Sequence, residues 1–138
     1  MALVIDASVA AKWFIEDELS VKAQAVLDRV RAEGAIVPAL FRWEIQNMLC
    51  RAILDHRLGR DDADEAFDAL GSLPIEVDNP GAQLIIGADA RLALQYDLTA
   101  YDAAYLATAL DHGVPLATAD TDLEHAARSS GIETLLVT

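Results

Sequence analysis

Four acidic residues lie at the ends of apolar segments or on the apolar face of an expected helix: Asp6, Glu44, Asp102 and Asp120. Asp6 directly follows the apolar run at 3–5, and Asp102 lies near the start of an apolar helical segment. Glu44 comes three residues after Phe41, so it shares the apolar side of its helix. A lone ionised carboxylate in apolar surroundings costs on the order of several kcal/mol, so these positions need a chemical explanation.

A divalent cation would explain a cluster of such carboxylates. Neighbouring carboxylates raise each other's pKa unless a cation neutralises their charge. Oxygen-only ligand sets suit hard ions such as Mg²⁺, which keeps several of its waters when it binds to protein. One ion or a pair can orient a phosphodiester, help to generate hydroxide and stabilise the leaving oxygen. The four acids therefore indicate a metal-dependent site that acts on phosphodiesters.

Each acid also has a structural interpretation. Asp6 and Asp120 are suitable N-caps for the helices that follow them. Asp102 comes three residues after Thr99, which is the spacing of a capping box. Glu44 could instead pair with an arginine, or reach water at the edge of the apolar stripe. These alternatives stay open, because one carboxylate oxygen can cap a helix while the other faces a cleft.

Short apolar strands alternate with helices along the chain. Strands are expected at 3–6, 35–37, 74–77, 114–117 and 132–137. In the first half of the chain, helices are expected at 8–31, with a break near 18–20, and at 39–56, where Gly59 closes the helix. Further helices are expected from Asp61 or Asp62 to Gly71, from Asn79–Pro80 to Tyr96, at 100–112 and at 122–130. This order predicts a single domain over 1–138 with a three-layer α/β/α fold. Helices would cover both faces of a central, mainly parallel sheet.

The expected sheet would bring two of the acids together. Active sites of open parallel sheets lie beyond the carboxyl ends of the strands. Asp6 ends the first strand, and Thr118 and Asp120 follow the fourth. If these strands are neighbours, the Asp6 and Asp120 carboxylates meet at one edge of the sheet.

The composition narrows the class of protein. Hydrophobic residues make up 54% of the chain and the mean hydropathy is +0.25, so we expect part of the apolar surface to lie in a subunit or partner interface. No apolar run is long enough to span a membrane, and the first residues do not resemble a secretory signal. Cys50 is the single cysteine, which excludes an internal disulfide. We therefore expect a cytoplasmic protein.

The net charge of −13 argues against a protein that coats nucleic acid. It remains compatible with an enzyme that binds a few phosphates through metal ions. Four arginines fall within one short region, where they form either a solvated helix face or a source of attraction for phosphates: Arg42, Arg51, Arg57 and Arg60.

Four segments together resemble a known family. They are IDAS at 5–8, PALFRWEIQNML at 38–49, LTAYDAAYLATA at 98–109 and LATAD at 116–120. In order and spacing they resemble the PIN-domain ribonucleases, and in particular the toxin subunits of bacterial VapBC toxin–antitoxin systems. The resemblance covers essentially the whole chain.

The resemblance implies an endoribonuclease that depends on Mg²⁺ or Mn²⁺ and hydrolyses RNA phosphodiester bonds with metal-activated water, leaving a 5′-phosphate and a 3′-hydroxyl. By position, Asp6 and Asp102 would contact the metal directly, and Glu44 and Asp120 would complete the site directly or through water. The supporting residues would be Thr118, Ser8 and Asp122. The family also implies a homodimer and a cognate antitoxin that covers the cleft.

Arg42 and Trp43 depart from what we expect just before Glu44, where smaller or aliphatic residues are more usual. They could influence the choice of RNA, or Trp43 could fill a gap in the core; we favour the core, because aromatic side chains dominate buried area.

Two other functions stay open. One is a catalytically silent PIN-like interaction module. The other is a haloacid-dehalogenase-like phosphatase, which would need a second aspartate where this chain has Ser8.

Overall fold

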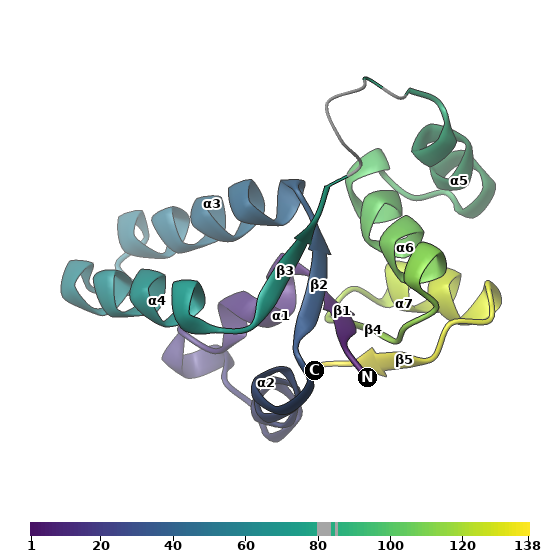
Figure 1. Ribbon diagram of the computed structural model, residues 1–138. Helices are drawn as coiled ribbons and strands as arrows, with labels where there is room; N and C mark the ends of the chain where they lie inside the picture. Colours follow the sequence, from purple (N-terminus) through teal and green to yellow (C-terminus); the bar gives the residue numbers. More distant parts are fainter. Residues whose placement is uncertain (80–83, 85) are drawn as a thin grey trace.

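Five strands form one parallel sheet within residues 1–79, 84 and 86–138, the part of the chain that the computed structural model describes (Figure 1). The strands are β1 (Leu3–Ile5), β2 (Ala35–Pro38), β3 (Ile75–Asp78), β4 (Leu116–Thr118) and β5 (Thr134–Leu136), in the spatial order β3-β2-β1-β4-β5. Both neighbours of β1 run parallel to it. Its three residues are fully buried, as a central strand covered on both faces requires.

Helices cover both faces of this sheet (Figure 1). They are α1 (Ala7–Lys12), the 3₁₀ turn η1 (Glu16–Glu18), α2 (Val21–Glu33), α3 (Leu40–Leu54), α4 (Arg60–Ser72), α5 (Ala88–Tyr96), α6 (Ala100–His112) and α7 (Thr121–Ser129). Helices α1 to α4 lie on one side of the sheet and α5 to α7 on the other. The three-layer α/β/α fold expected from the alternation of strands and helices is confirmed.

Several helix boundaries differ from the sequence prediction. Helix α3 ends at Leu54, and Gly59 is the N-cap of α4 rather than the residue that closes α3. Asp61 and Asp62 therefore lie in the first turn of α4, where negative charge interacts favourably with the helix dipole. The expected helix start at Pro80 lies outside the described residues, and α5 begins at Ala88.

The pairing of β1 with β4 places the expected site. Ile5 lies opposite Ala117 in the register, and the Asp6 amide donates to the Ala117 carbonyl at 3.2 Å. The first and fourth strands are therefore neighbours, as the sequence argument required. Asp6 and Thr118 consequently lie side by side at the carboxyl edge.

Among the described residues, no helix has the length and apolar composition to cross a membrane.

The two tryptophans occupy opposite environments. Trp13 is 8% exposed, and its indole Nε1 donates to the Ala23 carbonyl at 3.0 Å, which joins the end of α1 to α2. Trp43 is 65% exposed, so the expectation that it fills the core is wrong. The buried stripe of α3 runs through Phe41 and Ile45, and a rotation of about 100° per residue turns Trp43 away from that stripe.

We predict that Trp13→Phe lowers the free energy of unfolding by about 1–3 kcal/mol, because the buried Ala23 carbonyl loses its donor. Urea denaturation followed by circular dichroism measures the loss. Trp43→Phe is the matched control and should change the free energy by less than about 0.5 kcal/mol, because its ring is exposed. Equal stability of the two variants would contradict the assigned role of the Trp13 hydrogen bond.

Candidate functional site

Asp6 is the most buried acid of the site, with 6% of its surface exposed. It is the N-cap of α1, and its Oδ1 accepts hydrogen bonds from the Val9 amide at 3.1 Å and the Ser8 hydroxyl at 2.5 Å. Its Oδ2 accepts a short hydrogen bond from the Thr118 hydroxyl. Asp6 therefore caps a helix and also belongs to a polar cluster at the sheet edge.

Thr118 and Ser8 join the two loops that carry the acids. The Thr118 hydroxyl donates to Asp6 and accepts from the Asp120 amide at 3.0 Å. The Ser8 hydroxyl donates to Asp6 and accepts from the Ala119 amide at 3.2 Å. Each hydroxyl thus fixes the Asp6 carboxylate relative to the segment that follows β4.

Asp120 is the N-cap of α7. Its Oδ1 accepts from the amides of Asp122 at 2.8 Å and Leu123 at 3.2 Å. The capping role that the sequence offered for Asp120 is therefore present in the structure. The contribution of Asp122 to this cap is its backbone amide.

Asp102 lies in the first turn of α6, and its amide donates to the Thr99 hydroxyl at 3.1 Å. This is the N-cap contact that the sequence predicted from the spacing of the two residues. The Asp102 side chain is half-buried, and the charges of Asp120, Asp6 and Asp122 all act on it. The carboxylates of three separate helix starts thus lie within electrostatic range of one another.

Glu44 joins this group through a residue that the sequence analysis did not single out. Its Oε1 accepts from the Tyr105 hydroxyl at 2.6 Å, although the two residues are far apart in the chain. Tyr105 is 1% exposed, and the charges of Glu44 and Asp6 both act on its hydroxyl. Its place three residues after Asp102, on an otherwise apolar face, is the signal that could have identified it.

The site carries negative charge that the protein does not neutralise. Burial raises the pKa of the Asp6 carboxyl above its ordinary value, hydrogen bonds from Ser8, Thr118 and the Val9 amide oppose the shift, and the charge of Asp120 adds to it. Burial also raises the pKa of Asp102, and the charges of Asp120 and Asp6 raise it further. Within the described ranges, no salt bridge involves any of the four acids Asp6, Glu44, Asp102 and Asp120.

The donor set fits a hard divalent cation, because it consists of carboxylate and hydroxyl oxygens without a cationic side chain to compete. The acids do not, however, converge fully. In the described part of the chain, no group of three His, Cys, Asp or Glu side chains stands where it could hold a metal ion. The acids do not converge on one point because Asp6 and Asp120 each direct a carboxylate oxygen at backbone amides of the helix that they cap.

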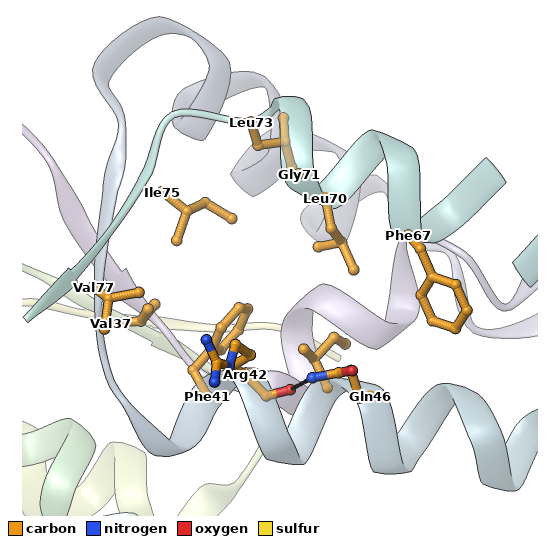
Figure 2. A pocket seen from close by; sticks show the side chains of 11 residues that line it. Val37, Phe41, Arg42, Gln46, Phe67, Leu70, Gly71, Leu73, Ile75 and Val77 are labelled. Carbon is orange, nitrogen blue, oxygen red and sulfur yellow. Dashed lines mark hydrogen bonds between the residues drawn. The ribbon is translucent and has the colours of Figure 1, made fainter. Parts of the chain in front are cut away.

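A separate apolar groove lies between α3, α4 and strands β2 and β3 (Figure 2). It has a volume of about 390 Å³. Its apolar lining consists of Val37, Phe41, Ile45, Phe67, Leu70, Leu73, Ile75 and Val77. Arg42 and Gln46 lie at its polar side, where the Gln46 side chain donates to the Arg42 carbonyl at 2.7 Å. The groove shares helix α3 with Glu44.

The fold and the acidic site together define the class of protein. The model of the PIN domain family matches residues 3–129. The chain therefore belongs to the PIN domain family, and the family resemblance noted in the four sequence segments is confirmed.

The chain is also similar to individual proteins, one by sequence and two by structure. Ribonuclease VapC1 from two strains of Mycobacterium tuberculosis is 35% identical over 125 residues, which cover 78% of this chain and 89% of that protein. The crystal structure of PAE2754 from Pyrobaculum aerophilum is similar with a TM-score of 0.70 and 22% identity, over 98% of this chain and 84% of that one. FitAcB from Neisseria gonorrhoeae gives a TM-score of 0.58 at 18% identity, over 96% of both chains. The two structural likenesses support the fold alone.

We predict that Thr118→Val lowers the free energy of unfolding by about 1–3 kcal/mol, because the Asp6 carboxylate loses a donor and the Asp120 amide loses an acceptor. Thr118→Ser should retain most of the stability. Thr108→Val is the matched control, since Thr108 is also buried and its hydroxyl donates to the Ala104 carbonyl of its own helix. The measurement is urea denaturation, and equal losses at positions 118 and 108 would contradict the prediction.

Proposed function

We propose that this protein is an endoribonuclease toxin of a type II toxin–antitoxin system, which hydrolyses RNA phosphodiester bonds with the help of a divalent metal ion. The observation that carries the proposal is the cluster of Asp6, Asp102 and Asp120 at the carboxyl edge of the sheet, whose charges act on one another and which have no salt-bridge partner among the described residues. The kinship with Ribonuclease VapC1 supports RNA as the substrate.

The proposed cofactor is Mg²⁺, for which Mn²⁺ could substitute. Asp6 and Asp102 would hold it directly, and Glu44 and Asp120 would complete the site directly or through water. When bound, such an ion supplies Lewis-acid chemistry: it polarises a phosphodiester oxygen and lowers the pKa of the attacking water.

The side chains around the acids would hold them in place for this chemistry. Ser8 and Thr118 donate to the Asp6 carboxylate, which opposes the rise in its pKa that burial causes. The Tyr105 hydroxyl orients Glu44, and burial together with Glu44 raises the pKa of Tyr105, so it remains protonated as a donor. Asp122 would add negative charge near Asp102.

The proposed regulator is a cognate antitoxin. The apolar groove between α3 and α4 would receive an apolar helix face of this partner, since side chains of both helices line it and its polar atoms are few. Because the groove shares α3 with Glu44, a segment seated there could continue across the acidic site. A basic side chain of the antitoxin would then neutralise the acids.

A homodimer is also proposed. Large apolar side chains are exposed on and just before α5, at Leu84, Ile86 and Leu94. Large exposed apolar side chains favour association with another protein surface.

The catalytically silent module has one observation in its favour, because Asp6 and Asp120 do serve as helix caps. Capping does not account for the Tyr105–Glu44 contact, so we favour the nuclease. The phosphatase alternative lacks its second aspartate: the Ser8 hydroxyl occupies that position and donates to Asp6.

We predict that Asp6→Asn and Asp102→Asn each lower Mg²⁺-dependent RNA cleavage by about 100-fold or more, because each removes a charged ligand of the proposed ion. Cleavage of a labelled single-stranded RNA, followed on denaturing gels, measures the rate. Asp64→Asn, an exposed acid of α4, is the control and should retain wild-type activity. Full activity in either site variant would disprove the assignment.

Metal binding has a readout that does not depend on catalysis. We predict that Mn²⁺ at about 100 times its dissociation constant raises the free energy of unfolding of the wild type by about 2–3 kcal/mol. Asp6→Asn should lose this stabilisation, whereas Asp64→Asn should keep it. Equal stabilisation of all three proteins would place the ion elsewhere, and none at all would favour the silent module.

A further inference from the structure

Two exposed aromatic side chains directly precede two acids of the site. The chain has eight aromatic residues, and Trp43 and Tyr101 are the most exposed of them, at 65% and 66%. Trp43 precedes Glu44 and Tyr101 precedes Asp102. Large aromatic rings are usually mostly buried, so their exposure here has a cost that folding alone does not explain.

The helices place both rings on the same side of the acidic site. Tyr101 lies one turn before Tyr105 on α6, and residues four apart are neighbours on a helix surface. Because the Tyr105 hydroxyl reaches Glu44 on α3, Tyr101 lies on the side of α6 that faces α3. The first turns of α3 and α6 lie at the same end of the sheet (Figure 1). Trp43 and Tyr101 are each one residue from an acid of the site and open to solvent, so both rings lie close to the acids.

Arg42 extends this surface. Its guanidinium carbon lies 5.0 Å from the centroid of the Trp43 ring, which is a cation–π contact. Arg42 takes part in no salt bridge with any other described residue. The contact restrains the indole ring and leaves the guanidinium able to meet a phosphate or a base.

The charge of the protein makes such a surface necessary for binding RNA. The net charge is −13, and the acids of the site repel phosphates until a cation is bound. Arg57, one of the four arginines of the basic region, is already paired with Asp17 and Glu18. Contacts that do not depend on net charge must therefore supply part of the affinity, and base stacking on aromatic rings is such a contact.

We propose that Trp43, Arg42 and Tyr101 form a stacking platform that binds unpaired bases next to the cleaved phosphodiester bond. The inference rests on the proposed ribonuclease function and names its substrate class as single-stranded RNA. Bases within a duplex are already stacked on each other and cannot lie on the rings, whereas splayed bases of loops and ends can. The platform holds the RNA strand beside the acids, so its three residues are positioning residues.

The first test separates binding from chemistry. Trp43→Ala should raise the KM for a short single-stranded RNA of mixed sequence by about tenfold, while kcat changes by less than about threefold. Trp43→Phe keeps a ring and should restore KM to within about threefold of the wild type. Leu54→Ala is the matched control: Leu54 is also 65% exposed and lies about three turns further along the solvent face of α3. It should leave both constants unchanged.

A second test asks whether a base contacts the ring. Single abasic nucleotides are placed in turn at each position flanking the cleaved bond. At one or more positions the loss of the base should raise the KM of the wild type about tenfold and that of Trp43→Ala by less than about threefold. The short single-stranded RNA with all its bases is then bound in Ca²⁺ and checked on a gel to be intact. It should quench tryptophan fluorescence in the wild type and not in Trp43→Phe, because the remaining Trp13 is buried.

The outcomes distinguish this inference from the function on which it rests. If the wild type cleaves RNA but Trp43→Ala behaves like Leu54→Ala, the platform is wrong and the nuclease stands. The same holds if Trp43→Ala keeps its kinetics and changes only the oligomeric state, because the ring then serves a protein contact. If the wild type cleaves no RNA in Mg²⁺ or Mn²⁺, both proposals fail.

Discussion

The rest of the site depends on one carboxylate held at the end of the central strand. Asp6 is almost fully buried and forms no salt bridge with any residue that the structure describes, and burial raises its pKa. Hydrogen bonds from Ser8, Thr118 and the Val9 amide oppose that shift. They can do so only because β1 and β4 are paired, which brings Thr118 to Asp6 across most of the length of the chain. The fold thus provides the donors that make a buried negative charge tolerable.

The same contacts show how one residue can cap a helix and still offer a second oxygen to the proposed metal ion. Asp6 and Asp120 begin helices α1 and α7, and their capping bonds fix where each carboxylate stands. A cap directs one oxygen at the helix amides and restrains the side chain, which gives the remaining oxygen a defined position. The proposed metal ion would therefore meet partly fixed ligands, at the cost of strong competition from the amides. A structural role and a catalytic one are compatible here, because they use different lone pairs.

Strong acidity and RNA as a proposed substrate impose opposite demands on the surface. The acids that would bind a metal ion repel the phosphates that the ion must engage. An aromatic surface beside the acids would reconcile these demands, because stacking depends on the faces of the bases rather than on charge. Trp43 is exposed because it lies opposite the buried stripe of α3, and Arg42 covers its ring. The apolar groove on the same helix, which Arg42 also lines, suits a protein partner.

The sequence by itself determined the order of strands and helices, the capping spacing of Thr99 and Asp102, and the acids Asp6 and Asp120 that cap helices, because these depend on local patterns of a few residues. It did not determine the environment of Trp43, the N-cap of α4 at Gly59, or the bond from Tyr105 to Glu44. Those were decided by the tertiary structure. Whether a side chain is buried, and which distant hydroxyl reaches a carboxylate, follows from the packing of helices against the sheet, and residue spacing along one helix carries no information about its neighbour.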